Sequence, residues 1–216
     1  LSQYSFLCLT ATVFGVAITV TPLPSLTVVI GAEEPERTVT TNPAPRIALD
    51  QQADRVCVTL DGEPFTEFRF HKDLVHGPVL FPLRGPGGVP LTRSWPVGPL
   101  LPGDPQDHPH HESFWCNHGD VNGHDFWTGR GGTRIEVESV DHVGDGRIEV
   151  SCRWLGPDGK VVCTDRRTVS FSAEVDDRII DHTITITASH GPLVFGDTKE
   201  GTMALRVRPE LNLKQA

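Results

Sequence analysis

The stretch RIEVSCRWLGPDGKVVCTDRRTVSFSAEVDDRIIDHTITIT, residues 147–187, decides the fold. Apolar side chains recur in it at every second position, as at Ile148, Val150, Cys152 and Trp154. A period of two is that of an antiparallel strand with one buried face. The stretch therefore predicts three strands in succession, ending near Trp154 and then spanning 161–173 and 180–187.

The same alternation continues upstream. Residues 55–60 and 64–70 flank Asp61-Gly62, a pair that tolerates the positive φ angles of a tight hairpin turn. Residues 133–140 predict a further strand, and no amphipathic helix of three turns follows residue 32. Regular strands separated by turns predict an all-β fold, an antiparallel β-sandwich.

Composition and the N-terminal segment bound the remaining organisation. A net charge of -9 argues against a nucleic-acid partner, because phosphates require a basic surface. The apolar run Phe6–Val20 and the small residues before Glu33 predict that 1–32 is an export signal or, alternatively, a retained membrane anchor. Residues 33–53 are polar and predict a linker, so 54–216 forms the domain, in the periplasm or outside the cell. Membrane contact is expected only through the uncleaved segment.

Four cysteines follow residue 32, and none of them forms a CxxC pair. Cys152 and Cys163 flank a predicted hairpin. They are expected either to form a disulfide across it or to remain isolated buried thiols.

Two segments carry the residue types of a functional site. Residues 104–127 (DPQDHPHHESFWCNHGDVNGHDFW) hold half of the ten histidines and predict a long loop with at most short strands, which in a compact domain is usually functional. Residues 194–207 place charged side chains between Gly196 and Gly201, which indicates a fixed backbone path. We expect the two segments to share one concave face.

Three motifs resemble a known family: HPHHESFWCNHGDVNGHDFW, WLGPDGKVVCTDRRTVSF and FGDTKEGTMALRV. They look like the planctomycete and Bacteroidetes family often labelled "methane oxygenase PmoA", over residues 54–208. The resemblance implies a sandwich akin to the galactose mutarotase-like supersandwich, export, and carbohydrate processing. Family members continue further, so it also implies a domain that is incomplete at its C-terminal end. No uncharged stretch of roughly 18 residues follows Ala32, so the membrane chemistry of that label is not predicted.

The resemblance implies a sugar epimerase, lyase or hydrolase-like enzyme that acts on a small molecule or an oligosaccharide by acid/base catalysis and needs no cofactor. The candidate catalytic residues are His110, His111, His118, Asp197, Lys199 and Glu200. The candidate substrate-binding residues are Trp115, Trp127, Asn122 and Asp125, because aromatic rings can stack on sugars.

Two other functions stay open, and the sequence does not decide whether the protein is an enzyme. One is a non-catalytic carbohydrate-binding module that uses the tryptophans. The other is a metal-dependent enzyme with a divalent ion at His108, His110, His118 and Asp120, since imidazole and carboxylate groups suit such ions. A purely structural role, with histidines bonded to loop carbonyls and tryptophans in the core, competes with all three functions.

Overall fold

A computed structural model describes residues 10–11, 46–174 and 177–212 of the chain. Apart from residues 10–11 and 46–53, the predicted export signal and linker lie outside these ranges. The described part is built from strands joined by loops and single 3-10 turns. No helix in this part of the chain is long and apolar enough to cross a membrane.

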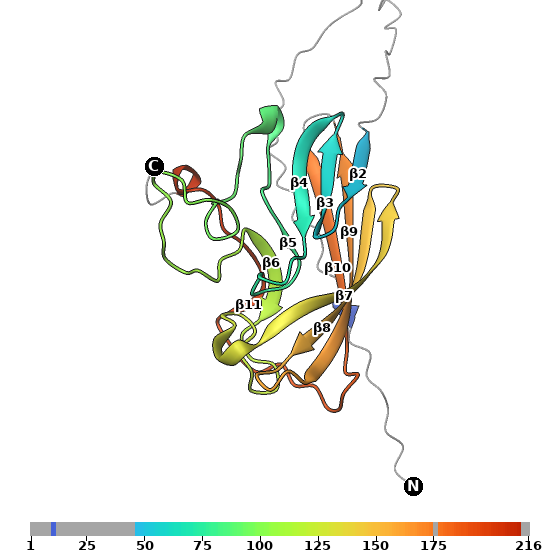
Figure 1. The fold of residues 1–216 in the computed structure, drawn as a ribbon, viewed down its shortest axis with the longest axis vertical. Coiled ribbons are helices and arrows are strands. Elements are labelled where there is room, and N and C mark those ends of the chain that lie inside the picture. The colour runs from blue at the N-terminus through green and yellow to red at the C-terminus, as the bar shows by residue number, and fades with distance from the viewer. Residues whose placement is uncertain (1–9, 12–45, 175–176, 213–216) are drawn as a thin grey trace, which may run out of the picture.

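The strands form two antiparallel sheets, which confirms the predicted all-β sandwich (Figure 1). One sheet has the order β1-β10-β9-β8-β7, with β1 Thr10–Ala11, β7 Arg134–Gly144, β8 Arg147–Leu155, β9 Val161–Ala173 and β10 Arg178–Thr187. The other has the order β11-β6-β5-β4-β3-β2, with β2 Ile47–Gln51, β3 Arg55–Leu60, β4 Glu63–Arg69, β5 Val79–Leu80, β6 Phe114–His118 and β11 Gly201–Leu205. The 3-10 turns are η1 Pro86–Gly88, η2 Arg130–Gly132 and η3 Pro209–Leu211.

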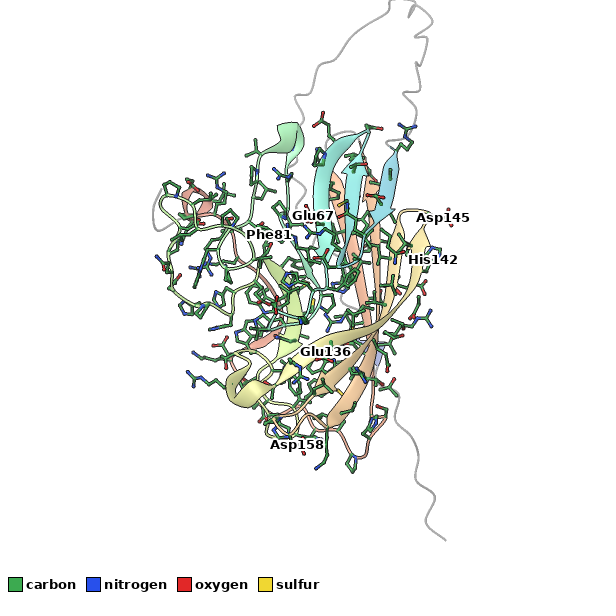
Figure 2. All side chains as sticks on the ribbon, in the orientation of Figure 1. Glu67, Phe81, Glu136, His142, Asp145 and Asp158 are labelled. Atoms are coloured by element: carbon green, nitrogen blue, oxygen red, sulfur yellow. The ribbon has the colours of Figure 1, made fainter. Side chains whose placement is uncertain are left out.

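The alternating pattern of the sequence places the core between the sheets. Ile148, Val150 and Trp154 of β8 are at most 2% exposed. They belong to one buried cluster with residues of β3 and β4, and Phe65 of β4 meets Phe171 of β9 edge to face at 6.0 Å between ring centroids. Figure 2 shows the side chains filling this space. The β3–β4 turn adopts the predicted positive φ angles, 50° at Asp61 and 84° at Gly62.

A buried ion pair interrupts this apolar core. Arg167 and Asp165 both point inward from β9, with fully buried side chains, and Arg167 Nη2 lies 3.0 Å from Asp165 Oδ2. Trp154 Nε1 donates a hydrogen bond of 2.6 Å to the same oxygen. Buried charges are tolerated when they are paired and hydrogen-bonded in this way.

One predicted boundary is corrected, and one prediction is made more specific. The segment read as a linker contains β2, because Ile47 and Leu49 alternate with exposed residues and pack against the core. The segment predicted to be a long loop with at most short strands contains one short strand, β6, which pairs with β5 on one side and β11 on the other. The bounds of this strand could not be predicted from the sequence, because side chains on both of its faces are buried and hydrophobicity does not alternate along it.

The disulfide alternative for Cys152 and Cys163 is not realised. In the β8–β9 register, Cys152 lies opposite Asp165 and Cys163 lies opposite Trp154, so the two thiols are offset along the strands. The four cysteines of the described residues are free, and these two are buried.

The chain between β5 and β6 forms a lobe of loops beside the β6–β11 edge (Figure 1). This lobe contains residues 104–113, which include His108, His110 and His111 and are called the histidine-rich loop below. It therefore lies outside the space between the sheets.

Candidate functional site

The histidine-rich loop is organised around one buried cation, Arg93, which is 1% exposed. Its guanidinium donates to Asp107 Oδ1 at 2.8 Å. It also donates to five backbone carbonyls, those of Trp95, Pro105, Asp107, His108 and His111, at 2.7–3.4 Å. Guanidinium has five N–H donors and no acceptor, so these oxygens satisfy its hydrogen-bonding capacity. The bonds fix the backbone path of the loop.

A second arginine closes the loop from the β11 side. Arg206 Nη2 lies 2.7 Å and 3.0 Å from the two carboxylate oxygens of Asp107. Its Nη1 lies 3.3 Å from Nδ1 of His111. Burial alone would raise the pKa of Asp107, but hydrogen bonds from His108 and Arg206 outweigh it and lower the pKa to about 2. Asp107 is therefore a permanent anion held between two cations.

Three imidazoles cluster on this loop. The ring centroids of His108 and His111 are 4.6 Å apart and stacked, and those of His110 and His111 are 4.7 Å apart and perpendicular. Burial and the neighbouring histidines lower the pKa of His111 to about 3. Burial and His108 also lower the pKa of His110. Both rings are thus neutral near pH 7, the form that can accept a proton.

A buried histidine that the sequence did not single out supports the loop from within. His76 is fully buried, and burial lowers its pKa to about 4. Its Nδ1 accepts a hydrogen bond of 2.6 Å from the Asn117 amide, so its Nε2–H donates to the carbonyl of His110. The neutral tautomer is therefore set by Asn117.

The backbone at His76 is in turn held by the buried carboxylate of Glu112. It is 4% exposed and accepts hydrogen bonds from the backbone N–H groups of Val75 and His76, at 3.0 Å and 3.1 Å. Burial raises the pKa of Glu112 to about 7, even though these two bonds act to lower it. No local pattern marks Arg93, His76 or Glu112 as supports, because each acts on residues distant in the sequence.

Strand β6 divides the predicted catalytic set. Trp115 and Asn117 point toward the loop, whereas Cys116 and His118 point toward the other sheet, as alternation along a strand requires. His118 Nε2 donates to the carbonyl of Gly196 at 3.0 Å, and its ring meets Phe195. His118 therefore cannot act together with His110 and His111, and the predicted grouping is corrected.

The two predicted segments do meet, although about eighty positions separate them. Gly119 N donates to the carbonyl of Glu200 at 2.8 Å, and Gly196 N donates to that of Asp120 at 2.9 Å. A Cβ atom at Gly196 would lie 2.0 Å from a carboxylate oxygen of Asp120, so any larger residue there would force the Asp120 side chain to move. Asn122 bonds to the backbone of Val194 and Pro192 at 2.7 Å and 3.0 Å, which makes it a structural clamp.

Of the charged residues before β11, Glu200 is the one whose charge affects the pKa of His110. The negative charges of Glu200 and Asp125 oppose the lowering of the His110 pKa. Lys199 is exposed and pairs with Glu200 at 3.2 Å, and Asp197 is exposed. The charges of Glu200 and Asp125 are thus near enough to act on His110, although no hydrogen bond or ion pair among the described residues joins these side chains.

The predicted aromatic platform is corrected as well. Trp115 and Trp127 are only 2% and 6% exposed, and their rings lie 5.3 Å apart in a small core under the loop. Neither ring can lie flat against a sugar without opening this core. Asp125 accepts hydrogen bonds from the backbone and hydroxyl of Thr128, so it also shapes the turn after Phe126.

The predicted metal ligands are not arranged as one set. His118 lies on the far face of β6 from His110, and Asp120 lies against Gly196. Within residues 10–11, 46–174 and 177–212, no group of three or more His, Cys, Asp or Glu side chains is placed to hold a metal ion.

The chain belongs to a family of unknown function, DUF6807, whose model matches residues 55–216. No curated protein and no solved structure matches the chain. Family membership therefore gives no activity.

Proposed function

We propose that this member of the DUF6807 family is a carbohydrate-active enzyme in which His110 moves a proton. The observation that carries the proposal is a half-buried imidazole of lowered pKa, with the carboxylates of Glu200 and Asp125 acting on it. A neutral imidazole accepts a proton from the substrate, and the two negative charges stabilise the imidazolium that forms. The imidazolium then returns the proton, as an epimerase, lyase or hydrolase-like step requires.

His110 suits this role better than His111. The ring of His111 is stacked on His108 and tilted against Trp115, and its Nδ1 faces Arg206. A neighbouring cation disfavours protonation of an imidazole. The carbonyl of His110, in contrast, is anchored by His76, and its ring is the one on which Glu200 acts. We assign proton transfer to His110 and electrostatic support to Glu200 and Asp125.

The choice of a sugar substrate rests on the resemblance described above, together with export. The uncharged apolar run Phe6–Val20 supports export of the domain. N-terminal sequencing of protein recovered from the periplasm or medium tests this part separately. A chain that keeps residues 1–32 and stays in the membrane would favour the anchored form.

The activity test uses reducing mono- and oligosaccharides in D₂O, with NMR detection of anomer interconversion, epimer formation and deuterium uptake. We expect His110→Gln to lower kcat by about 10²–10⁴-fold, the usual contribution of a general acid/base group. Glu200→Gln should lower kcat and move the acidic limb of the pH–rate profile to lower pH, because the imidazolium loses a stabilising charge. His142→Gln on β7, whose ring bonds only to Gly144 locally, is the matched control.

Unchanged turnover in both His110→Gln and Glu200→Gln would remove the assignment. Saturable sugar binding without turnover would favour the binding-module alternative. Loss of activity on chelation, with recovery on adding one divalent ion, would favour the metal-dependent alternative.

A further inference from the structure

A polar pocket lies between β4 and the lobe of loops that follows β5. Its volume is about 270 Å³, close to the roughly 300 Å³ at which small-molecule sites begin. Its wall includes Glu67 of β4 and Phe81 of the lobe, both labelled in Figure 2. Within the described part of the chain, none of His108, His110 and His111 belongs to this wall, so the pocket is separate from the proposed acid/base site.

The charges in the wall leave one cation without a counter-charge. Six charged side chains line the pocket, and four of them form two ion pairs, Arg69 with Glu67 at 2.8 Å and Arg208 with Glu210 at 3.1 Å. The remaining cation, Arg84, donates to the carbonyl of Gly88 at 3.1 Å. Among the described residues no carboxylate lies within 4.0 Å of its guanidinium. Its planar array of N–H groups is therefore available to the carboxylate of a ligand.

Two further wall residues offer hydrogen-bonding atoms that solvent can reach. Asp104 Oδ2 accepts hydrogen bonds from the backbone N–H groups of Trp95 and Leu101, at 3.3 Å and 3.2 Å, whereas its Oδ1 has no partner in the described ranges. Ser94 is only 9% exposed, yet its hydroxyl has no partner there either and is not sealed from solvent. Hydroxyl groups of a ligand can donate to the carboxylate oxygen, and they can both donate to and accept from the serine hydroxyl.

We propose that this pocket binds a sugar acid, a polyhydroxylated ring that carries one carboxylate. The carboxylate pairs with Arg84, ring hydroxyls bond to Asp104 and Ser94, and ring C–H groups lie against the four prolines of the wall, Pro82, Pro90, Pro99 and Pro102. A neutral sugar would leave Arg84 without a counter-charge. A carboxylic acid without hydroxyls would displace water from Asp104 and Ser94 and leave them unpaired. Binding here requires no proton transfer at His110, so it is independent of the proposed catalytic chemistry.

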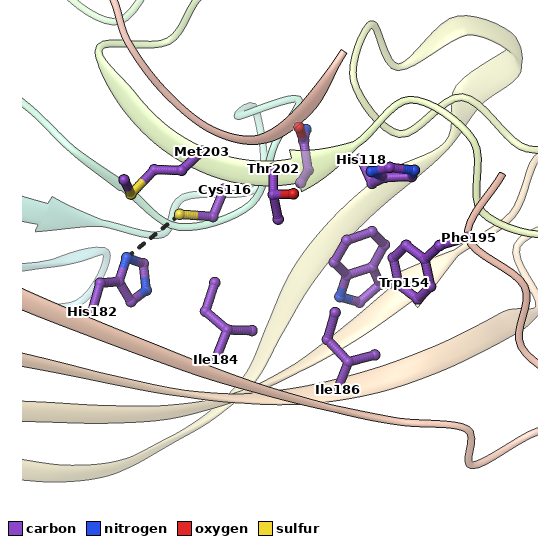
Figure 3. A pocket seen from close by; sticks show the side chains of 10 residues that line it. Cys116, His118, Trp154, His182, Ile184, Ile186, Phe195, Thr202 and Met203 are labelled. Carbon is purple, nitrogen blue, oxygen red and sulfur yellow. Dashed lines mark hydrogen bonds between the residues drawn. The ribbon is translucent and has the colours of Figure 1, made fainter. Parts of the chain in front are cut away.

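The test measures binding of the methyl glycosides of glucuronic and galacturonic acid, whose blocked anomeric centre prevents anomer interconversion. In protein with isotope-labelled leucine and methionine methyl groups, at least one of them should shift the NMR signal of Leu101 in the pocket wall saturably. Met203, the single methionine, lines the apolar cavity between β6 and β10 (Figure 3), so its signal should stay in place.

Two related compounds separate the charge from the hydroxyls. The uncharged amide of the same glycoside should bind about tenfold more weakly, the effect of losing hydrogen bonds to a charged group. Cyclohexanecarboxylate, which keeps the charge and the ring but has no hydroxyls, should also bind about tenfold more weakly, because two neutral hydrogen bonds are lost.

Variants of two wall residues identify the contacts. Arg84→Gln should bring the preference for the acid over its amide to about one, whereas Arg84→Lys, which keeps the charge, should retain most of it. Arg166→Gln is the matched control, because it removes the same charge from an exposed arginine of β9 outside the pocket wall. Ser94→Ala should weaken the acid and the amide alike, by about fivefold. His110→Gln should bind the glycoside as the wild type does.

Three results would overturn the proposal: no saturable shift of Leu101 with either glycoside, equal binding of acid and amide to the wild-type protein, or an undiminished preference in Arg84→Gln. If Arg84→Gln does not fold, the wild-type comparison of acid with amide and the Ser94→Ala variant still decide the matter.

Discussion

Replacing Glu112 by glutamine should change how stability depends on pH. The folded protein holds this carboxyl with a pKa of about 7, against an ordinary value of 4.5. Between these two values the folded state binds more protons than the unfolded state, so this group makes stability fall as pH rises. At 1.36 kcal/mol per pH unit, the interval corresponds to about 3 kcal/mol. Glutamine cannot ionise and does not incur this loss.

The measurement is urea unfolding of wild type and Glu112→Gln at pH 4, 5, 6, 7 and 8. We expect the free energy of unfolding of the variant to gain about 3 kcal/mol relative to wild type across this range. His76 and His182 act in the opposite direction in both proteins, because burial lowers their pKa values to about 4 and about 3, and stability rises as pH rises from those values to roughly 6.5. Their effect cancels in the difference.

The control is Glu210→Gln, a fully exposed carboxylate paired with Arg208. It should show no comparable gain. A difference between wild type and Glu112→Gln that stays constant from pH 4 to pH 8, or that favours wild type as pH rises, would refute the reasoning about burial.

Three further substitutions test the supports of the fold. Arg93→Met should lower the free energy of unfolding by about 3–5 kcal/mol, because it leaves Asp107 and the loop carbonyls without their buried donor; Arg206→Met, at the exposed side of Asp107, should cost clearly less in the same urea titration. Asp165→Asn should cost about 3–5 kcal/mol by leaving Arg167 unpaired, and the double variant Asp165→Asn/Arg167→Met should recover part of that loss; strict additivity would contradict coupling. Trp127→Ala should cost about 3–5 kcal/mol in thermal unfolding, as a cavity in a buried cluster does; a change below about 1 kcal/mol would mean that the ring is not packed.

The sequence was sufficient for the strands whose two faces differ. In β8, charged and polar residues alternate with apolar ones, and Asp61-Gly62 marks the β3–β4 hairpin directly. Strand β6 could not be found in this way, because Trp115 and Asn117 are buried under the loop while Cys116 is buried under the other sheet. Because neither face of β6 is exposed, its five residues show no alternation of polar and apolar side chains.

The candidate site was predicted only in part, because its grouping depends on which face of β6 each side chain occupies. The meeting of the histidine-rich segment with Glu200 was expected and is present. His118 is separated from His110 because alternate side chains of β6 point to opposite faces of the sheet. This alternation could not be applied to the segment until the position of β6 was known. The buried supports His76 and Arg93 act on residues 34 and up to 18 positions away, so only the folded chain reveals them.

Arg93 has a consequence for how freely the histidine-rich loop can change. All but one of its bonds go to main-chain carbonyl oxygens, which every amino acid carries. Much of the outline of the loop is thus set from one position outside it. The bonds from Arg93 to the carbonyls of His108 and His111 do not involve those residues' side chains, so substitutions that suit the local backbone can change the chemistry offered at this edge and leave these bonds in place.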